Sequence, residues 1–266
     1  MKNLTNNIIL HQNIGKTEFI QFKKLLEFPE IKHCYTLRKN NINIQLKDDD
    51  KSIITASYQK VGEVLGIAYE NIVKPHQTHT DRVEVVNNIC EQFEEVDGLI
   101  TDKKDICLCT TSADCTSLLF YDYKNKVIGD VHSGWRGTLR KIGKKAVERM
   151  IKTYECKPEN IICSISPCIK KCHFEVEEEV ASMFKKEFEY TGRINEIIEI
   201  GRIVEGIQKY NIDTTLINQI ILAEIGLRKE NIIDSNICTV CNSDLFHSYR
   251  KDKELSGRNG AFIGMV

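Results

Sequence analysis

Four polar segments interrupt the apolar pattern of this 266-residue chain and hold the side chains that could do chemistry. They cover residues 75–81, 111–116 and 132–138, and residues 246–250 followed by Gly257 and Arg258. The first three segments contain histidines and one cysteine. Imidazole and thiolate ligands suit Zn²⁺ or copper and disfavour Mg²⁺. The residue types therefore indicate a site for a single transition-metal ion.

Cys115 and His132 are expected to lie at the same edge of a β-sheet. Residues 117–121 and 127–132 are β-prone, and the Asp- and Asn-containing segment 122–125 is typical of a hairpin turn. Cys115 then enters one strand where His132 leaves its antiparallel neighbour, about 4.8 Å away. The third ligand would arrive from a loop, and spacing alone does not separate His76 from His79.

Three protein ligands leave a fourth coordination position open, which is typical of a catalytic site. A zinc ion in such a site lowers the pKa of bound water to about 7. The same hairpin geometry also permits a Cys115 nucleophile with His132 as its base. A third interpretation is that these side chains are simply packed or hydrogen-bonded.

The segment from Ser133 to Thr138 favours binding of an anion. Gly134 and Gly137 flank Trp135 and Arg136 directly before a predicted helix, so backbone N–H groups and a guanidinium face one space. This pattern predicts a phosphate or carboxylate subsite. The alternative is a tight strand-to-helix turn that Trp135 anchors in the core.

Composition and charge favour a small-molecule substrate. The chain has 37 basic and 38 acidic residues, which gives no electrostatic footprint for nucleic acid or an anionic membrane. The N-terminal residues lack the apolar core of a signal peptide, and the longest apolar runs are too short to cross a bilayer. We therefore expect a soluble cytoplasmic protein with no nucleic-acid or membrane partner.

The eleven cysteines do not indicate a disulfide framework, because their number is odd and a cytosol is reducing. Cys238 and Cys241 have the CxxC spacing of metal ligands, but no second CxxC pair completes four ligands. We interpret this pair, and the pairs Cys168 with Cys172 and Cys107 with Cys109, as packing cysteines.

The predicted elements indicate an α+β fold, because strands and helices interleave without strict alternation. Helical spacing marks residues 15–28, 55–66, the segment after Gly134, and 214–225 with Asp213 as N-cap, and residues 174–188 are amphipathic. Strands are expected at residues 82–86, 98–101, 106–111, 117–121, 127–132, 161–165, 232–237 and 261–266. With no repeat or linker, we predict one domain over 1–266, a mixed β-sheet with flanking helices, and the metal site at a sheet edge.

In these segments the sequence resembles the laccase-domain, or polyphenol oxidase, family. Its members are described as purine nucleoside phosphorylases with adenosine deaminase activity. The matching pieces occur in order from about residue 70 to the end of the chain. They are His76-Gln77-Thr78-His79, Val96-Asp97-Gly98, Ser112-Ala113-Asp114-Cys115, 132–137, Ser166-Pro167-Cys168-Ile169, Cys238-Thr239, 248–250 and Gly257-Arg258.

The resemblance implies an α+β fold and zinc bound by His79, Cys115 and His132, with copper as the less favoured metal. It selects His79 over His76 as the ligand. It also implies phosphorolysis of adenosine, inosine, guanosine and methylthioadenosine, and hydrolytic deamination of adenosine. The implied partners are thus a purine nucleoside and phosphate, bound by a monomer or homodimer.

The resemblance and the residue chemistry also predict roles for particular residues. We expect catalytic roles for Asp114, Cys115, His132 and Arg136. The expected substrate contacts are Arg38, His76, Gln77, Ser133, Gly134, Arg250 and Arg258. The chain departs from the family where residues 39–43 replace a glycine-rich segment, which puts any contact made by that segment in doubt.

Three other functions stay open at the level of sequence. A copper polyphenol oxidase is disfavoured because several coppers would be hard to house with only seven histidines, four of which (His11, His33, His173 and His247) fall outside the metal-like segments. One site of two histidines and a cysteine could still hold a single copper. A cysteine hydrolase would use Cys115 as nucleophile. A non-enzymatic nucleotide-binding module would leave the open metal position without a role.

Overall fold

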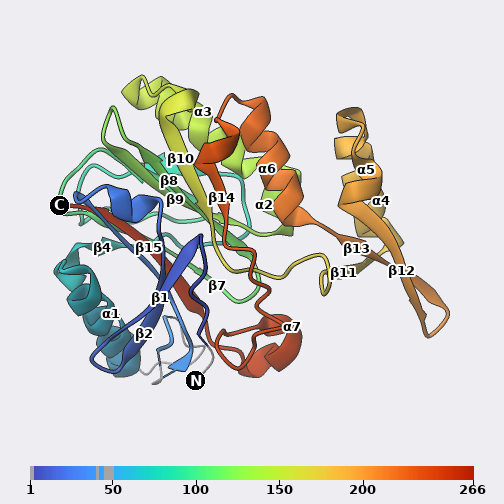
Figure 1. The fold of residues 1–266 in the computed structure, drawn as a ribbon, viewed down its shortest axis with the longest axis horizontal. Helices are drawn as coiled ribbons and strands as arrows, with labels where there is room; N and C mark the ends of the chain where they lie inside the picture. Colours follow the sequence, from blue (N-terminus) through green and yellow to red (C-terminus); the bar gives the residue numbers. More distant parts are fainter. Residues whose placement is uncertain (1–2, 40–41, 45–50) are drawn as a thin grey trace.

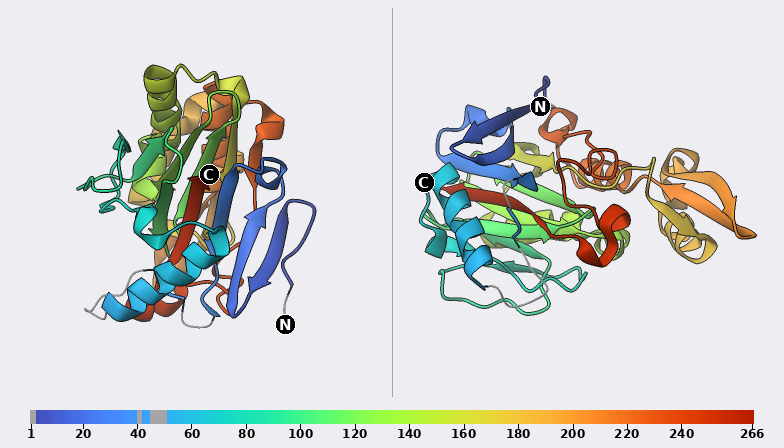
Figure 2. Two further views of the ribbon diagram at one scale, coloured as in Figure 1. Left: turned by 90° about the vertical axis from the view of Figure 1, so that its left-hand side faces the viewer. Right: turned by 90° about the horizontal axis from the view of Figure 1, so that it is seen from below.

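Two β-sheets packed face to face form the centre of the protein, and helices cover the outer face of each sheet (Figures 1 and 2). The computed structural model describes residues 3–39, 42–44 and 51–266. The first sheet has the strand order β1 (Ile9–Ile14), β2 (Thr17–Phe22), β3 (Ile31–Thr36), β15 (Asn259–Met265), β7 (Cys107–Ser112) and β4 (Ile72–Val73). Helix α1 (Lys51–Leu65) packs on its outer face.

The second sheet has the order β14 (Ile232–Asp234), β10 (Ile161–Ile165), β8 (Thr116–Asp122), β9 (Val127–Ser133), β6 (Gly98–Thr101) and β5 (Val83–Val85). Its outer face is covered by α2 (Trp135–Leu139), α3 (Ile142–Tyr154) and α6 (Thr214–Glu224). Both sheets combine antiparallel pairs with parallel pairs at their edges. The parallel pairs are β4 with β7 in the first sheet, and β10 with β14 and β5 with β6 in the second. The predicted α+β fold with a mixed β-sheet and flanking helices is confirmed, and the structure forms the body from two mixed sheets instead of one.

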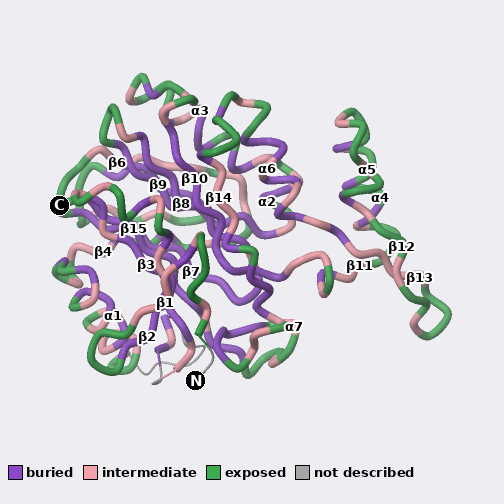
Figure 3. The backbone as a smooth tube through the Cα atoms, viewed as in Figure 1, coloured by how far each residue is buried: buried purple, intermediate pink, exposed green. Residues whose placement is uncertain are grey.

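A smaller unit projects from one side of this body (Figure 1). It contains a three-stranded sheet in the order β11 (Glu175–Glu177), β13 (Ile207–Ile212) and β12 (Ile198–Val204), with α4 (Glu178–Phe188) and α5 (Ile194–Ile197). Much of β12 and β13 is exposed or half-buried, unlike the central strands of the body (Figure 3). The remaining helix, α7 (Tyr249–Asp252), precedes β15. Short 3-10 turns lie at Leu25–Glu27, Tyr69–Asn71, Pro158–Asn160, Glu189–Thr191, Lys229–Asn231 and Lys253–Leu255.

The layers explain why the central strands are buried along their whole length. In β8, Leu119 and Tyr121 join the core between the two sheets, whereas Leu118 and Phe120 join the core beneath α3. Successive side chains of a strand point to opposite faces. Because both faces of β8 are buried, its sequence shows a continuous apolar run instead of an alternation.

The hairpin that connects β8 and β9 forms as predicted. The carboxylate of Asp122 accepts the backbone N–H groups of Lys124 and Asn125 at 2.9 and 3.0 Å. Lys126 then takes a left-handed conformation, with φ of 56°. The turn sets the register that pairs Ser117 with His132 at the far end of the hairpin.

The helix predicted over residues 15–28 is wrong. Residues 17–22 form β2, which pairs with β1 across a turn at Gly15. Phe19 packs on the α1 side of the sheet and Phe22 packs between the sheets, so the buried side chains follow the period of a strand. The helix-like spacing of the phenylalanines and leucines in this segment arises from a strand followed by a 3-10 turn.

The other predicted elements agree better with the structure. The eight predicted strands appear as β5 to β10, β14 and β15, with ends shifted by up to three residues. Helices α1 and α6 are present, and Asp213 caps α6 by accepting the N–H of Leu216 at 2.8 Å. Within 3–39, 42–44 and 51–266, no helix combines the length and apolarity needed to cross a bilayer. The single-domain division over 1–266 stays a prediction.

Candidate metal centre

The chain passes from one sheet to the other at the loop 113–115, where β7 ends and β8 begins. Cys115 directly precedes β8, and His132 is the next-to-last residue of β9. The antiparallel register pairs Thr116 with Ser133 and Ser117 with His132. Cys115 and His132 therefore lie at the same end of the second sheet, as the hairpin geometry predicts.

His79 completes a cluster with these two side chains. One metal-binding atom from each of His79, Cys115 and His132 lies within 4.8 Å of the others. The Cys115 Sγ lies 4.0 Å from the His79 Nε2, and the two imidazole ring centres are 5.0 Å apart. His132 is buried, Cys115 is half-buried and His79 is exposed. The cluster therefore opens toward solvent on the His79 side.

Asp97, at the start of β6, organises both histidines of this cluster. Its buried carboxylate lies 2.7 Å from the His132 Nδ1. It also accepts the backbone N–H groups of Thr78, His79 and Thr80 at 3.2, 3.1 and 2.6 Å. These bonds hold His79 in a left-handed conformation, with φ of 62°. A carboxylate on one imidazole nitrogen is the usual outer partner of a metal-binding histidine, and it leaves the other nitrogen for the ion.

The pKa values of Asp97, His132 and Cys115 favour the charged form of each side chain. Burial opposes ionisation of Asp97, but hydrogen bonds from His132 and Thr80 lower the pKa of its carboxyl to about 2. Burial likewise disfavours protonated His132, yet the Cys115 thiolate and Asp97 raise the pKa of the imidazole to about 9. Burial opposes ionisation of Cys115, and the charges of His132 and His79 outweigh it and lower the pKa of the thiol to about 6. The neighbouring charges therefore favour the thiolate form of Cys115, which is the form that binds metals.

Gly134 leaves the space that the cluster occupies. A Cβ atom at this position would lie 2.8 Å from the His79 ring and 3.3 Å from the Cys115 Sγ. Such a contact would push a ligand aside. Gly134 thus acts through its lack of a side chain, and the sequence prediction of a substrate contact there stays a prediction.

Two cavities meet at the cluster. One of about 320 Å³ is lined by Gln77, His79, Thr111, Ser112, Ala113, Cys115, His132, Tyr249 and Arg258. A second cavity of about 270 Å³ extends to Ser133, Trp135, Phe174 and Arg250. The residues that line both cavities are His79, Ala113, Cys115 and Tyr249. A concave space with a few convergent polar groups is the usual form of a small-molecule site.

Arg258 and Gln77 face the first cavity. The guanidinium of Arg258 donates to the carbonyl oxygens of Ser256 and Gly257 at 3.2 and 3.0 Å. Its backbone N–H donates to the Asn43 side chain at 2.9 Å, so part of the divergent segment 39–43 supports Arg258. Residues 40 and 41 of that segment lie outside the described residues. The Gln77 side chain donates to the Thr111 carbonyl at 2.9 Å and accepts the Thr111 N–H at 2.8 Å.

The Asp114 carboxylate accepts hydrogen bonds from two neighbouring segments. One carboxylate oxygen accepts the hydroxyl of Thr239 at 2.6 Å, and the other accepts the backbone N–H of Arg250 at 2.6 Å. Asp114 itself is in a left-handed conformation, with φ of 86°. These contacts fix the loop that carries Cys115. The guanidinium of Arg250 donates to the carbonyls of His173 and Glu175, so it bridges protein segments at the cavity wall.

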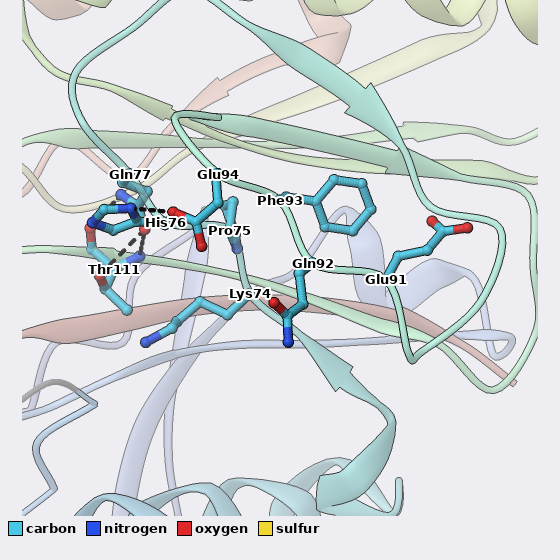
Figure 4. Close-up of a pocket in the computed structure, with 9 residues that line it drawn as sticks. All are labelled: Lys74, Pro75, His76, Gln77, Glu91, Gln92, Phe93, Glu94 and Thr111. Atoms are coloured by element: carbon cyan, nitrogen blue, oxygen red, sulfur yellow. Dashed lines mark hydrogen bonds and ion pairs between the residues drawn. The ribbon is translucent and has the colours of Figure 1, made fainter.

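Three of the predicted site residues lie away from the cluster. His76 points into a neighbouring cavity of about 270 Å³, where its Nδ1 lies 2.6 Å from the Glu94 carboxylate (Figure 4). Arg38 donates to the Ser243 carbonyl and to Asp252. Arg136 is exposed, with its guanidinium 4.3 Å from the Trp135 ring centre. None of these three lines either cavity at the cluster.

Ser133 lies at the edge of the second cavity, but its hydroxyl is turned into the fold. It lies 2.9 Å from the Thr138 hydroxyl and 3.3 Å from the Asn218 side-chain oxygen. Asp97 and Thr239 lie outside the four polar segments, and Tyr249 lies within the fourth segment but was not among the predicted site residues. Asp97 belongs to the matched Val96-Asp97-Gly98 segment, which carried the only signal for it.

The donor set fits a transition metal. Two imidazoles and one thiolate match the ligands of zinc or copper sites, and the Asp97–His132 contact supplies the orienting partner that such sites use. The third donor side chain in the cluster is that of His79, whereas His76 is paired with Glu94 outside the cluster. Among the described residues, no methionine lines the two cavities at the cluster to act as the axial thioether of a blue-copper site.

Comparison with known proteins identifies the family of this chain and several named relatives. The family described as multi-copper polyphenol oxidoreductase laccase matches residues 33–266. A purine nucleoside phosphorylase of Bacteroides thetaiotaomicron is 32% identical over 71% of this chain and 71% of its own length. An adenosine deaminase named RL5, from an unknown prokaryotic organism, is 32% identical over 73% and 75% of the two chains.

The fold has a close structural counterpart. The crystal structure of the Bacillus licheniformis hypothetical protein YfiH superposes with a TM-score of 0.85 at 24% identity, covering 96% of this chain and 99% of that one. The expected resemblance is confirmed by the sequence match, which includes every residue of the metal cluster. The chain belongs to the multi-copper polyphenol oxidoreductase laccase family, whose relatives carry the names purine nucleoside phosphorylase and adenosine deaminase.

Proposed function

We propose that this chain is a zinc-dependent purine nucleoside phosphorylase that also deaminates adenosine. The observation that carries the proposal is the three-donor cluster of His79, Cys115 and His132 at the meeting point of two cavities. The names of the relatives supply the substrate class, a purine nucleoside with phosphate or water as the second substrate. Adenosine, inosine, guanosine and methylthioadenosine are the nucleosides to test.

Each residue of the cluster has a distinct part in this proposal. Cys115, His79 and His132 would hold the ion through one sulfur and two nitrogens. When bound, zinc would supply Lewis-acid chemistry that polarises water or a substrate atom. Asp97 orients His132 and the His79 backbone, and it keeps His132 from turning its ligand nitrogen away.

The walls of the cavities would bind the nucleoside. Tyr249 lines both cavities and is 44% exposed, which makes its ring available to a purine base. Arg258 is the cation that faces the first cavity, so we assign it the contact with phosphate or ribose oxygens. Gln77 is locked by two bonds to Thr111 and shapes the wall. We assign Asp114 a positioning role, because both of its oxygens hold other segments.

The other residues that were predicted to contact the substrate have less structural support. Ser133 and Arg250 contribute to the wall of the second cavity, although the Ser133 hydroxyl and the Arg250 guanidinium are bonded to the protein. Arg136, Arg38 and His76 would reach a substrate only by leaving the contacts described above. We therefore rank Arg258 and Tyr249 ahead of these three as substrate contacts.

A test of the proposal starts from protein depleted of metal and reloaded with zinc. Inosine with phosphate and adenosine without phosphate are incubated with both preparations, and the products are separated by HPLC. We expect hypoxanthine from inosine and inosine from adenosine only in the reloaded sample. Stoichiometric zinc with neither product would refute the purine assignment.

The second candidate is a cysteine hydrolase, favoured by the thiolate character of Cys115 beside protonated His132. Iodoacetamide separates the two candidates. If Cys115 is a zinc ligand, zinc protects it from alkylation and a chelator exposes it. Equal labelling with and without zinc, together with zinc-independent ester hydrolysis, would favour the hydrolase.

A further inference from the structure

A second group of metal-binding side chains lies outside the candidate metal centre. Cys172, His173, Cys238 and Cys241 each offer one ligand atom, and all four atoms lie within 4.8 Å of one another. We propose that these four residues, here called the neck cluster, bind a structural zinc ion. The assignment does not depend on the reaction that the candidate metal centre performs.

The distances within the neck cluster agree with a tetrahedral site. Zn–S bonds of about 2.3 Å and Zn–N bonds of about 2.0–2.1 Å place two sulfurs about 3.8 Å apart and a sulfur and a nitrogen about 3.5 Å apart. The Cys172 and Cys241 sulfurs are 3.8 Å apart. The His173 Nδ1 lies 3.2, 3.7 and 3.5 Å from the sulfurs of Cys172, Cys238 and Cys241.

Other interpretations of these cysteines fit less well. A disulfide needs two sulfurs about 2.05 Å apart, well below the 3.8 Å between Cys172 and Cys241. The sequence-based interpretation as packing cysteines is wrong for Cys172 and Cys241, because both are exposed. By contrast, Cys107 and Cys109 are packed beneath α1, as expected. One histidine and three cysteines form a complete set of four ligands, which is typical of structural zinc.

The neck cluster lies where the projecting unit joins the body. Cys172 and His173 directly precede Phe174 and β11, in the yellow segment that leaves the body in Figure 1. Cys238 and Cys241 follow β14 of the second sheet. The two segments already touch through a β-bridge, in which the Cys168 N–H donates to the Ile237 carbonyl at 3.2 Å and the Thr239 N–H donates to the Cys168 carbonyl at 3.0 Å. A bound ion would fasten these segments together.

The same cluster is connected to the candidate metal centre through one side chain. Thr239 lies between Cys238 and Cys241, and its hydroxyl donates to Asp114, the neighbour of Cys115. Arg250 reinforces the connection, because its backbone holds Asp114 and its guanidinium holds the His173 carbonyl. Zinc in the neck cluster would therefore stabilise the loop that presents Cys115, without contact with substrate.

The test measures zinc by elemental analysis after the protein is loaded with zinc chloride and passed through a desalting column. We expect two zinc ions per wild-type chain and one in Cys115→Ser, in which the neck cluster is untouched. Cys241→Ser should lose the neck zinc, whereas Cys241→His, which keeps a donor, should retain it. Cys90→Ser, which removes an exposed cysteine outside both clusters, is the matched control and should keep two ions.

Cobalt gives a second readout that does not require a variant of the neck cluster. Co²⁺ bound to Cys115→Ser should show thiolate charge-transfer and tetrahedral ligand-field absorption.

Thermal unfolding gives a third readout. Removal of the neck zinc should lower the Tm of the protein by roughly 5–10 °C. A Cys115→Ser protein that binds no metal while its neck thiols titrate as free would overturn the proposal. Loss of two titratable thiols without reductant would overturn it in favour of a disulfide.

Discussion

The two histidine–cysteine clusters differ in how many ligands the protein supplies. His79, Cys115 and His132 provide three donors beside two cavities, whereas the neck cluster provides four donors with distances that match a closed tetrahedron. Three protein ligands leave room for a substrate or water, and four do not. The same residue types thus favour a reactive site in one place and a structural site in the other.

The two clusters also differ in the structural elements that carry their residues. The three-donor cluster is built on strand ends that the hairpin register fixes, and a buried carboxylate orients its histidines. The neck cluster is built on two connecting segments that meet through a single β-bridge. Rigid elements hold a reactive geometry, whereas in the neck the ion itself would supply the rigidity.

The largest expected effect comes from removing a ligand of the three-donor cluster. Cys115→Ser should reduce phosphorolysis and deamination by roughly 10³-fold or more, because the site loses its thiolate and its ion. Activity assays on inosine and adenosine measure the loss, with Cys90→Ser as control. Full activity in Cys115→Ser would show that the three-donor cluster is not the reactive site, and the proposed difference between the two clusters would then be wrong.

Asp97→Asn should produce a smaller loss, of about 10- to 100-fold in zinc affinity or activity. The amide keeps the size of the side chain but removes the charge that orients His132 and accepts three N–H groups. Zinc titration with a competing indicator measures the affinity. The neck zinc should be unaffected, and a comparable loss there would show that the substitution acts by general destabilisation.

Chelation should release the two ions in a defined order. We expect EDTA to remove the first equivalent at least about tenfold faster than the second, because an open coordination position admits the chelator and a filled shell does not. Activity should fall together with the first equivalent. Stopped-flow release monitored with a metal indicator resolves the phases, and activity that follows the slow phase would reverse the assignment.

A final prediction concerns the folding stability contributed by a histidine outside both clusters. His33 is fully buried and its Nε2 accepts the Phe22 N–H at 2.8 Å, and burial lowers the pKa of its imidazole to about 3. In the unfolded chain the value is about 6.5, so below pH 6.5 the unfolded state binds the proton more readily. Stability should therefore fall with decreasing pH between about 6.5 and 3, by up to about 1.4 kcal/mol per pH unit.

Denaturant unfolding of the chelated protein at several pH values measures this slope. Chelation removes the competition between protons and metal at the two clusters. His33→Gln cannot titrate and should show a shallower slope. An unchanged slope in this variant would assign the pH dependence to the cluster histidines or to carboxyl groups.

The sequence predicted the local geometry of the three-donor cluster. The β-prone runs on either side of the Asp122 turn were enough to place Cys115 and His132 at one sheet edge, because register in a hairpin follows from a short segment. The strand predictions succeeded for a similar reason. The helix predicted over 15–28 failed because Phe19 and Phe22 bury on opposite faces of a sheet that only distant strands complete.

What the sequence by itself determined is therefore which residues alternate, turn and cap. Only the tertiary structure decided which distant side chains meet. His76 pairs with Glu94 while His79 reaches Cys115, and Cys172 with His173 meets a CxxC pair whose first cysteine lies 65 residues after His173. The physical reason is that such encounters depend on packing between layers, and local periodicity carries no information about which layers meet.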